Sequence, residues 1–347
     1  MDITNLERVL EGEPKYRLAQ AREAVYKNFI SNWDEATFFT KDLRDKLNKE
    51  CPLEIKADVL VSEREDSVKA KITLKDGLQI ETVLMRHKDP LRSEVNGRNT
   101  VCVSVQVGCP LGCLFCATGK MGFKRNLTSA EILEQVIFFN RYLKKIIPRS
   151  SAGMPLSVTN VTYMGMGEPF LNYDNVLESV KILNDHKYFN IGVRSISVST
   201  AGIIEGIEKL SKEPLHINLA ISLHAPNNKL RGELMPINKK YPLAKVLKAV
   251  DNYIEKTKRK VMFEYVLIKG VNDSDEHAKE LAKIMGDNKL YFVNLILYNA
   301  TGVFQPSTTE RVKEFRAILE KLKIRYTQRY RFGDDIQAAC GQFATSK

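Results

Sequence analysis

No stretch of this 347-residue sequence approaches the roughly 18 uninterrupted apolar residues that a membrane-spanning helix requires. Its first residues also lack the basic and then apolar pattern of a secretory signal. No internal repeat or low-complexity tract stands out. These absences argue against a membrane-embedded, secreted or repeat-array protein, and they predict a cytoplasmic protein with no membrane partner.

Cysteine is also scarce, with six residues in the whole chain. The cytoplasm keeps thiols reduced, and a chain of this length can bury enough apolar surface to fold without covalent cross-links. A framework of disulfide bonds is therefore not expected. Three of the six cysteines, Cys109, Cys113 and Cys116, lie within eight positions among several glycines. This grouping indicates a metal site or catalysis.

Negative charge is in deficit, since 42 Asp and Glu oppose 53 Lys and Arg and leave a net charge of +11. A basic balance favours a polyanionic partner, because basic side chains neutralise phosphates and release counterions. Basic runs at residues 256–260 and 321–331 are candidate phosphate contacts. Charge alone leaves open the simpler interpretation of a basic, solvated surface.

The first part of the chain differs in pattern from the rest. Residues 1–50 have helical spacing with many charges, and residues 53–86 alternate like short strands. The polar segment 88–100 has little periodicity and marks a boundary. We therefore expect a small N-terminal α+β domain at residues 1–90 and a second domain at residues 91–347.

Six apolar, β-branched runs recur between helical stretches in the second part of the chain. They lie at residues 101–107, 156–164, 194–200, 216–224, 260–268 and 291–299. Strands that alternate with helices form a parallel sheet with right-handed crossovers. The sequence therefore predicts an α/β fold in which six βα units form a partial (β/α)6 barrel, with its chemistry at the carboxyl ends of the strands.

Polar residues alternate with apolar ones inside these strands. In residues 101–107 the valines share one face, which leaves Cys102, Ser104 and Gln106 on the other. Two further strands repeat the pattern. A packed barrel interior would be filled with Val, Ile and Leu, so polar inner faces predict an open barrel that holds a polar ligand. The alternative is an ordinary sheet whose polar face contacts solvent.

The three clustered cysteines have the spacing C-x3-C-x2-C in the segment GCPLGCLFCATGK, residues 108–120. A structural zinc ion requires four ligands, often as two C-x2-C pairs, and no fourth ligand follows nearby in the sequence. Three thiolates instead suit a 4Fe-4S cluster with one iron left open to a substrate or cofactor. Cys109, Cys113 and Cys116 are therefore the predicted cluster ligands.

This spacing follows the first strand of a βα series, and the next strand closes with MGMGEP at residues 164–169. Together they resemble the radical S-adenosylmethionine (SAM) superfamily. Further segments narrow the resemblance to the RlmN/Cfr family of radical SAM adenine methyltransferases of ribosomal RNA. The matching segments are CVSVQVGCPLGCLFCATG, MGFKRNLT, MGMGEPFLNYDNV, SVSTAG, SLHAPN, LMPIN, GVND and GDDIQAACGQ.

The resemblance implies two cofactors, a 4Fe-4S cluster and SAM, and a reaction with two catalytic cysteines. One SAM methylates Cys340, and a second SAM supplies the radical that abstracts hydrogen from that S-methyl group. The carbon radical adds to the base, and Cys102 resolves the adduct by forming a disulfide with Cys340. Glu81 matches the proton acceptor of the family. The SAM contacts carried over by position are Gly167, Glu168, Ser199, Ser222, His224 and Asn299.

The implied substrate is C2 of an adenine in 23S rRNA and, for some bacterial members, also the adenine 3′ to the tRNA anticodon. Pro169 favours C2, because the C8-methylating branch that confers antibiotic resistance departs from this proline. The resemblance also implies an external electron donor such as flavodoxin, and a monomer. Two alternatives from other classes remain. One is a non-catalytic RNA-binding module in which the three cysteines and His224 hold zinc, and the other is a radical enzyme that acts on a protein or a small molecule.

Overall fold

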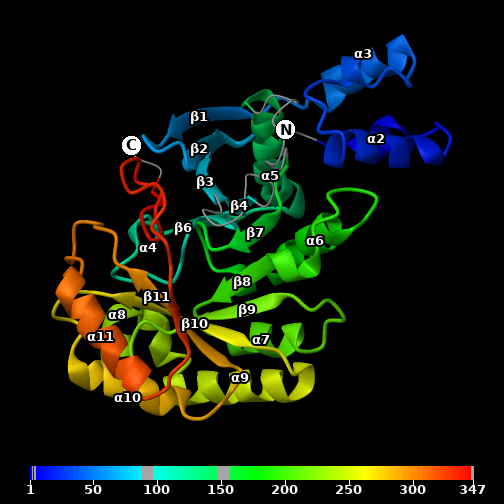
Figure 1. Ribbon diagram of the computed structural model, residues 1–347. Coiled ribbons are helices and arrows are strands. Elements are labelled where there is room, and N and C mark those ends of the chain that lie inside the picture. The colour runs from blue at the N-terminus through cyan, green and yellow to red at the C-terminus, as the bar shows by residue number, and fades with distance from the viewer. Residues whose placement is uncertain (2, 4, 88–96, 147–156, 345–347) are drawn as a thin grey trace.

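The computed structural model describes residues 1, 3, 5–87, 97–146 and 157–344 of the chain. Its main sheet has ten strands, which are ordered in space as β1 (Lys56–Val61), β2 (Ser67–Thr73), β3 (Gln79–His87), β4 (Arg98–Cys102), β7 (Asn160–Tyr163), β8 (Ile196–Thr200), β9 (Asn218–Ser222), β10 (Val261–Leu267), β11 (Tyr291–Leu297) and β12 (Tyr326–Gln328) (Figure 1). Neighbours from β1 to β4 are antiparallel. Neighbours from β4 to β12 are parallel.

The parallel part of this sheet contains the expected βα units. Strands β4, β7, β8, β9, β10 and β11 fall within or overlap the six predicted runs, so the α/β fold with a partial (β/α)6 barrel is confirmed. Within the described residues no pairing joins β1 to β12, and the sheet stays open. The short strand β12 is an addition to the prediction, because it lies inside the basic run at residues 321–331.

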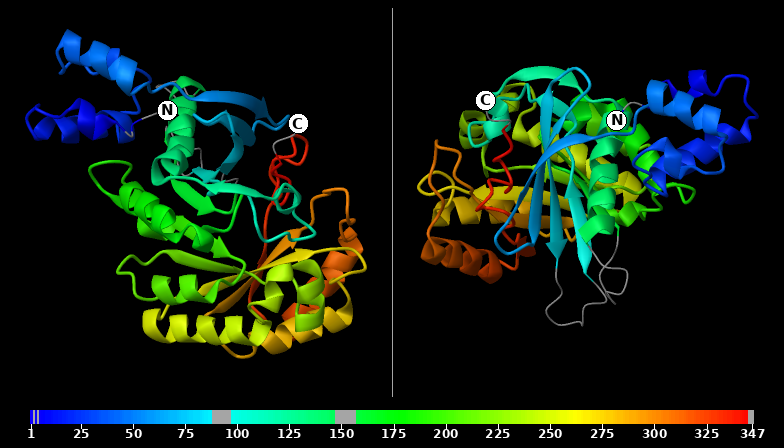
Figure 2. Two further views of the ribbon diagram at one scale, coloured as in Figure 1. Left: turned by 180° about the vertical axis from the view of Figure 1, so that it is seen from behind. Right: turned by 90° about the horizontal axis from the view of Figure 1, so that it is seen from above.

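Helices connect the parallel strands and flank the outer side of the sheet (Figures 1 and 2). They are α5 (Ser129–Ile146), α6 (Tyr173–Asn184), α7 (Ile204–Leu210), α8 (Asn228–Leu234), α9 (Leu243–Thr257), α10 (Asp275–Met285) and α11 (Thr309–Lys321). Helix α9 illustrates why they form, because its buried residues Val246, Val250 and Ile254 recur every fourth position on one face. None of the helices in the described parts of the chain combines the length and the apolarity that crossing a bilayer requires.

The prediction of one strand over residues 101–107 is wrong. Strand β4 ends at Cys102, and β5 (Gln106–Gly108) forms a separate two-stranded sheet with β6 (Phe123–Asn126). The amides of Val105 and Gln106 both donate to the carbonyl of Met166, at 2.8 and 3.2 Å. Two consecutive donors on one acceptor interrupt the regular ladder, as in a bulge, and the chain leaves the main sheet at this point.

The N-terminal part adds helices to one end of the sheet. They are α1 (Leu6–Val9), α2 (Tyr16–Tyr26), the 3-10 turn η1 (Trp33–Glu35) and α3 (Lys41–Glu50). The predicted domain boundary at residues 90 and 91 lies outside the described residues. Strand β3 before it pairs with β4 after it, with Val83 opposite Cys102. The sheet therefore continues from the N-terminal strands into the parallel part.

The remaining short elements lie near the carboxyl ends of the parallel strands, or between α6 and β8. They are α4 (Ala117–Lys120), η3 (Pro169–Leu171), η4 (Val193–Ser195) and η5 (Pro236–Lys239). After β12 the described part of the C-terminal segment, residues 329–344, has no regular structure and returns to α4 and the N-terminal strands (Figure 1). The hydrogen bonds that hold it there include those from Lys69 Nζ to the carbonyl of Gln337 at 3.3 Å and from Thr118 Oγ1 to that of Phe343 at 2.6 Å.

Candidate functional site

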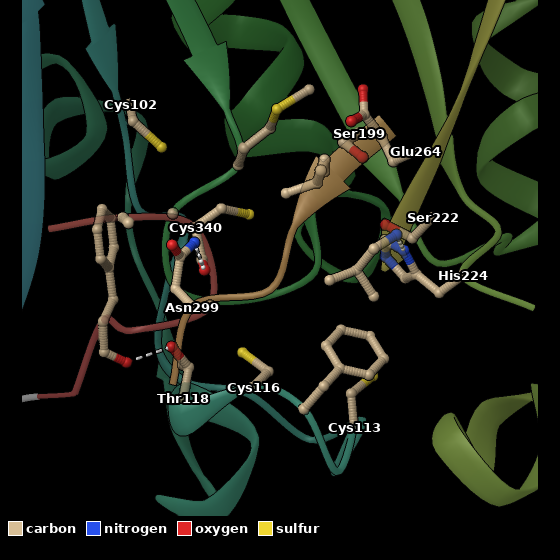
Figure 3. A pocket seen from close by; sticks show the side chains of 18 of the residues that line it. Cys102, Cys113, Cys116, Thr118, Ser199, Ser222, His224, Glu264, Asn299 and Cys340 are labelled. Carbon is tan, nitrogen blue, oxygen red and sulfur yellow. Dashed lines mark hydrogen bonds between the residues drawn. The ribbon is translucent and has the colours of Figure 1, made fainter. Parts of the chain in front are cut away.

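A cavity opens at the carboxyl ends of the parallel strands (Figure 3). Its walls come from the strand ends, from the loop with the three clustered cysteines, and from the C-terminal segment. Eleven of the twelve site residues predicted from the sequence line it: Cys102, Cys109, Cys113, Cys116, Gly167, Glu168, Ser199, Ser222, His224, Asn299 and Cys340. Glu81 is not among the lining residues.

The loop from Gly108 to Lys120 is held by its neighbour Gly122 and by two distant parts of the chain. Gly108 has φ +75°, and a Cβ on it would lie 1.8 Å from the carbonyl oxygen of Gly122, so glycine is required there. The backbone hydrogen bonds that hold the loop include Cys109 N to Gly122 O (2.9 Å), Leu114 N to Leu234 O (3.0 Å) and Ala117 N to Gly341 O (2.8 Å).

The three thiols of this loop are partly or fully shielded from solvent. Cys109 is buried, while Cys113 and Cys116 are half-buried. Burial raises the pKa of Cys109 to about 12, and burial followed by the nearby Cys116 raises the pKa of Cys113 well above its usual value. Thiols in such a place resist ionisation until a cation binds them. The loop therefore suits a metal cofactor better than a free nucleophile.

Gly167 and Glu168 close the end of β7. Gly167 has φ +100°, and a Cβ on it would lie 2.5 Å from the Cβ of Gln106, which excludes any larger residue. The Gln106 side chain accepts a hydrogen bond from Glu168 N at 2.9 Å. The Glu168 carboxylate accepts bonds from Phe170 N at 3.0 Å and Ala201 N at 2.7 Å. Both oxygens are thus oriented by backbone amides before any ligand arrives.

His224 is buried at the end of β9, beside Ser222. Its Nδ1 accepts a hydrogen bond from Val266 N at 3.2 Å, so the proton of the neutral ring is on Nε2. Burial, and then the charge of Arg231, lowers the pKa of His224 to about 3. The ring is therefore a neutral donor, and Ser199 and Ser222 add half-buried hydroxyls to the same wall.

Asn299 connects the strand ends with the C-terminal segment. Its Nδ2 donates to the carbonyl oxygen of Cys340 at 3.1 Å. Its Oδ1 is buried and has no hydrogen-bond partner within the described structure. A buried, unsatisfied amide oxygen costs free energy on the order of 1–3 kcal/mol. A polar ligand in the cavity would remove that cost.

Cys102 and Cys340 are far apart in the sequence but line the same cavity (Figure 3). Both are unbonded thiols, with Cys102 buried at the end of β4 and Cys340 exposed to the open space of the cavity. Burial raises the pKa of Cys102, and desolvation by the walls of the cavity raises the pKa of Cys340 to about 11. Arg329 opposes both shifts, because its charge favours the thiolates.

Comparisons with known proteins give the family. The radical SAM superfamily model matches residues 151–282. A protein of Dictyoglomus thermophilum described as a probable dual-specificity RNA methyltransferase RlmN is 44% identical over 98% of this chain and 94% of its own length. A protein of the same description from Chloroflexus aurantiacus is 43% identical over 96% of this chain and 88% of its own.

The chain belongs to the RlmN family of radical SAM methyltransferases. The crystal structure of a radical SAM methyltransferase from Sphaerobacter thermophilus has a TM-score of 0.88 and 40% identity, and the match covers 99% of this chain and 97% of that one. Membership of the superfamily identifies the cofactors as a 4Fe-4S cluster and SAM.

The residues of the cavity fit this pair of RlmN-family cofactors. The three cysteines of one loop, Cys109, Cys113 and Cys116, line the cavity together. Zinc needs its ligands within about 2.3 Å of a single ion, whereas each cysteine of a cluster binds a different iron. The Nδ1 of His224 is already an acceptor for Val266 N. The arrangement therefore favours a cluster over zinc.

Glu81, the predicted proton acceptor, lies elsewhere. Its carboxylate is buried on β3, where Lys69 Nζ is 3.4 Å away and Ala344 N donates to it at 3.0 Å. Burial raises the pKa of Glu81, while the charge of Lys69 lowers it. These contacts fasten the C-terminal segment to β3. The catalytic role of Glu81 stays a prediction.

Two cavity residues were missed in the sequence. Glu264 lies in the middle of β10, opposite Ser222, with 3% exposure. Asn294 Nδ2 donates to its Oε2 at 2.8 Å, and its buried Oε1 has no hydrogen-bond partner in the described structure. A glutamate inside the apolar run VMFEYVL was the available signal. Arg329 was hidden in a basic run that also fits a solvated surface.

Proposed function

We propose that this protein methylates C2 of an adenine in 23S rRNA, and also the adenine 3′ to the tRNA anticodon, with Cys340 as the methyl carrier and two SAM consumed per methyl transferred. The observation that carries the proposal is the meeting of Cys102 and Cys340 in the cavity that holds the three-cysteine loop. The relatives named for dual-specificity RNA methylation support the two RNA substrates. A net charge of +11 suits either RNA.

The residues of the cavity have separate roles in methyl transfer. When bound, the cluster and SAM supply an electron and a hydrogen-abstracting radical. Cys340 presents its sulfur to the cavity as the methyl acceptor, and Asn299 holds the backbone of that residue. The guanidinium of Arg329 stabilises the thiolate that methyl transfer to Cys340 requires, because it lowers the pKa that burial has raised.

Cys102 releases the product. Its thiolate attacks the sulfur of Cys340, the bond between that sulfur and the methylene on the base breaks, and the electron pair stays with the carbon, which takes a proton. The disulfide between Cys102 and Cys340 must then be reduced before another turnover. Cys102 is buried at the end of β4 and faces the cavity, which suits a thiol that acts only inside the closed site.

Pro169 supports C2 over C8. It is the first residue of η3, directly after Glu168, and it is buried. The C8-methylating branch is the alternative, and mass spectrometry of the methylated adenosine separates the two branches. The proposal has four further parts: contact of residues 1–90 with RNA, an external electron donor such as flavodoxin, a monomeric state and a cytoplasmic location. Each of these could be wrong while the two-cysteine chemistry still holds.

The deciding experiment combines a variant with analysis of the product. Purified Cys102→Ala protein, loaded with cluster and SAM, is expected to accumulate a covalent RNA adduct through Cys340, because no thiol remains to resolve it. Cys340→Ala should give no adduct, and Cys51→Ala, outside the cavity, should behave as wild type. Normal turnover of Cys102→Ala would contradict the two-cysteine mechanism.

Nuclease digestion and mass spectrometry of the RNA identify the product. We expect 2-methyladenosine in both rRNA and tRNA that the wild-type protein has treated. The appearance of 8-methyladenosine would move the protein to the other branch. Methylation of rRNA without tRNA would remove only the second substrate, and no methylated adenosine in either RNA would refute the proposal.

A further inference from the structure

Arg231 on α8 is one of the largest fully buried side chains of the protein, with 0% exposure. A buried guanidinium normally has a carboxylate partner, because an unpaired buried charge is costly. All hydrogen-bond acceptors of Arg231 are instead neutral: Ala201 O (2.6 Å), Asn238 Oδ1 (2.8 Å), Ser222 O (3.3 Å) and Tyr241 O (3.4 Å).

No Asp or Glu of the described residues forms an ion pair with Arg231 or favours its charge. Burial lowers the pKa of Arg231 to about 10, so the side chain remains a cation at neutral pH. Its charge is therefore left without an anionic partner among the described residues.

The guanidinium of Arg231 lies behind the wall of the cavity. Its Nη2 donates to the carbonyls of Ala201 and Ser222, and both of these residues line the cavity. Helix α8 is also joined to the cysteine loop, since Leu114 N donates to Leu234 O at 3.0 Å and Leu234 belongs to the same apolar cluster as Cys109. Helix α8 therefore holds a buried positive charge beside the predicted cluster loop.

We propose that Arg231 is the built-in counter-charge of the iron-sulfur cluster, and that it makes the cluster easier to reduce. Three thiolates make the bound cluster anionic, and reduction adds one more negative charge. A buried cation stabilises the more negative state by more, because the dielectric screening is weak there. The inference rests on the cluster that the proposed function requires, and it does not depend on which carbon is methylated.

Asn238 offers a test that leaves Arg231 in place. Asn238→Asp keeps the shape of the side chain and places a carboxylate on the guanidinium, which cancels most of its charge. We expect the midpoint potential of the cluster to fall, so that the ratio of reduced to oxidised cluster at the wild-type midpoint drops by roughly tenfold, or about 59 mV for a one-electron couple. Redox titration followed by electron paramagnetic resonance measures this shift. Arg231→Met should shift the potential in the same direction.

Two controls separate charge from packing. Asn238→Leu removes the same hydrogen bond without adding a charge and should leave the potential unchanged. Arg141→Met removes a half-buried arginine, which donates to the carbonyls of Phe29 and Leu53, and should destabilise the protein without a redox effect.

An unchanged potential in Asn238→Asp overturns the proposal whatever Arg231→Met does. Loss of the cluster from Asn238→Asp alone supports it, because the added carboxylate would then repel the cluster. Loss of the cluster from both Asn238 variants would assign Arg231 a packing role and also overturn the proposal. A wild-type protein that holds the cluster and does not methylate RNA would contradict the proposed function alone.

Discussion

At the scale of single residues, two glycines of the cysteine loop both have a positive φ, but one is tightly packed and the other borders open space. Gly108 has φ +75°, and a Cβ there would lie 1.8 Å from the carbonyl oxygen of Gly122. Gly112 has φ +63°, and a Cβ there would meet nothing within 4 Å. A side chain at the first position must displace backbone, whereas at the second it only strains its own backbone.

This contrast leads to a matched pair of variants. Gly108→Ala should lower the free energy of unfolding by more than about 3 kcal/mol and abolish cluster binding, because β5 and β6 cannot both keep their positions. Gly112→Ala should cost about 1 kcal/mol and retain the cluster. Urea unfolding and iron and sulfide analysis measure both effects. Equal losses in the two variants would show that the close approach at Gly108 is unimportant.

At the scale of elements, the C-terminal segment forms one wall of the cavity and depends on β3 for its place. His87 is the last residue of β3, and its ring packs edge-on against Phe332 with ring centroids 4.6 Å apart. Burial, followed by the charges of Arg98 and Arg329, lowers the pKa of His87 to about 4. The folded protein therefore prefers the neutral imidazole.

A pH dependence of stability follows from this contact. His87 has a pKa of about 4 in the folded state and about 6.5 when unfolded, so between these values the unfolded chain binds more protons. The contribution of neutral His87 to the free energy of unfolding should be fully present above about pH 6.5. It should fall by about 2 kcal/mol as the pH drops to 4, which is less than the full linkage value because the side chain is partly exposed to solvent. Chemical unfolding across this range measures it. His87→Gln should flatten the profile, and an unchanged profile would contradict the assignment.

The element scale also explains the position of Glu81. Lys69 on β2 and Ala344 in the C-terminal segment both bind its carboxylate. From the sequence, an acidic residue at a strand end can be a catalytic base, a surface charge or a structural anchor. The contacts favour the anchor, and Glu81→Gln is therefore better tested for stability of the C-terminal segment than for proton transfer.

At the scale of the whole molecule, the net charge of +11 bears on the binding of RNA. Basic side chains that contact phosphates release counterions, so affinity falls as salt rises. We expect the dissociation constant for an rRNA fragment to rise at least about tenfold between 50 and 200 mM salt. Fluorescence anisotropy with a labelled fragment measures this, with a neutral peptide nucleic acid of the same sequence as a control. Binding that is independent of salt would mean that the positive charge does not face the RNA.

The sequence by itself determined the parts of this protein that are local along the chain. The spacing of Cys109, Cys113 and Cys116 selects a cluster over zinc within eight positions. The alternation of apolar runs and helical stretches determines the six βα units, because strand and helix periods are properties of neighbouring residues. The motif residues at the strand ends were implied by the resemblance to the RlmN/Cfr family, and the pattern adds that they share one edge, since parallel strands present their carboxyl ends there.

Only the tertiary structure decided what depends on long-range contact. Cys102 and Cys340 line one cavity because the C-terminal segment returns to it, and the same segment binds the carboxylate of Glu81 through Ala344 N. Arg231 has no carboxylate partner among the residues that the structure describes, and the sequence around Arg231 gives no sign of this. Burial and pairing are sums over residues brought together from all parts of the chain, so no local pattern contains them.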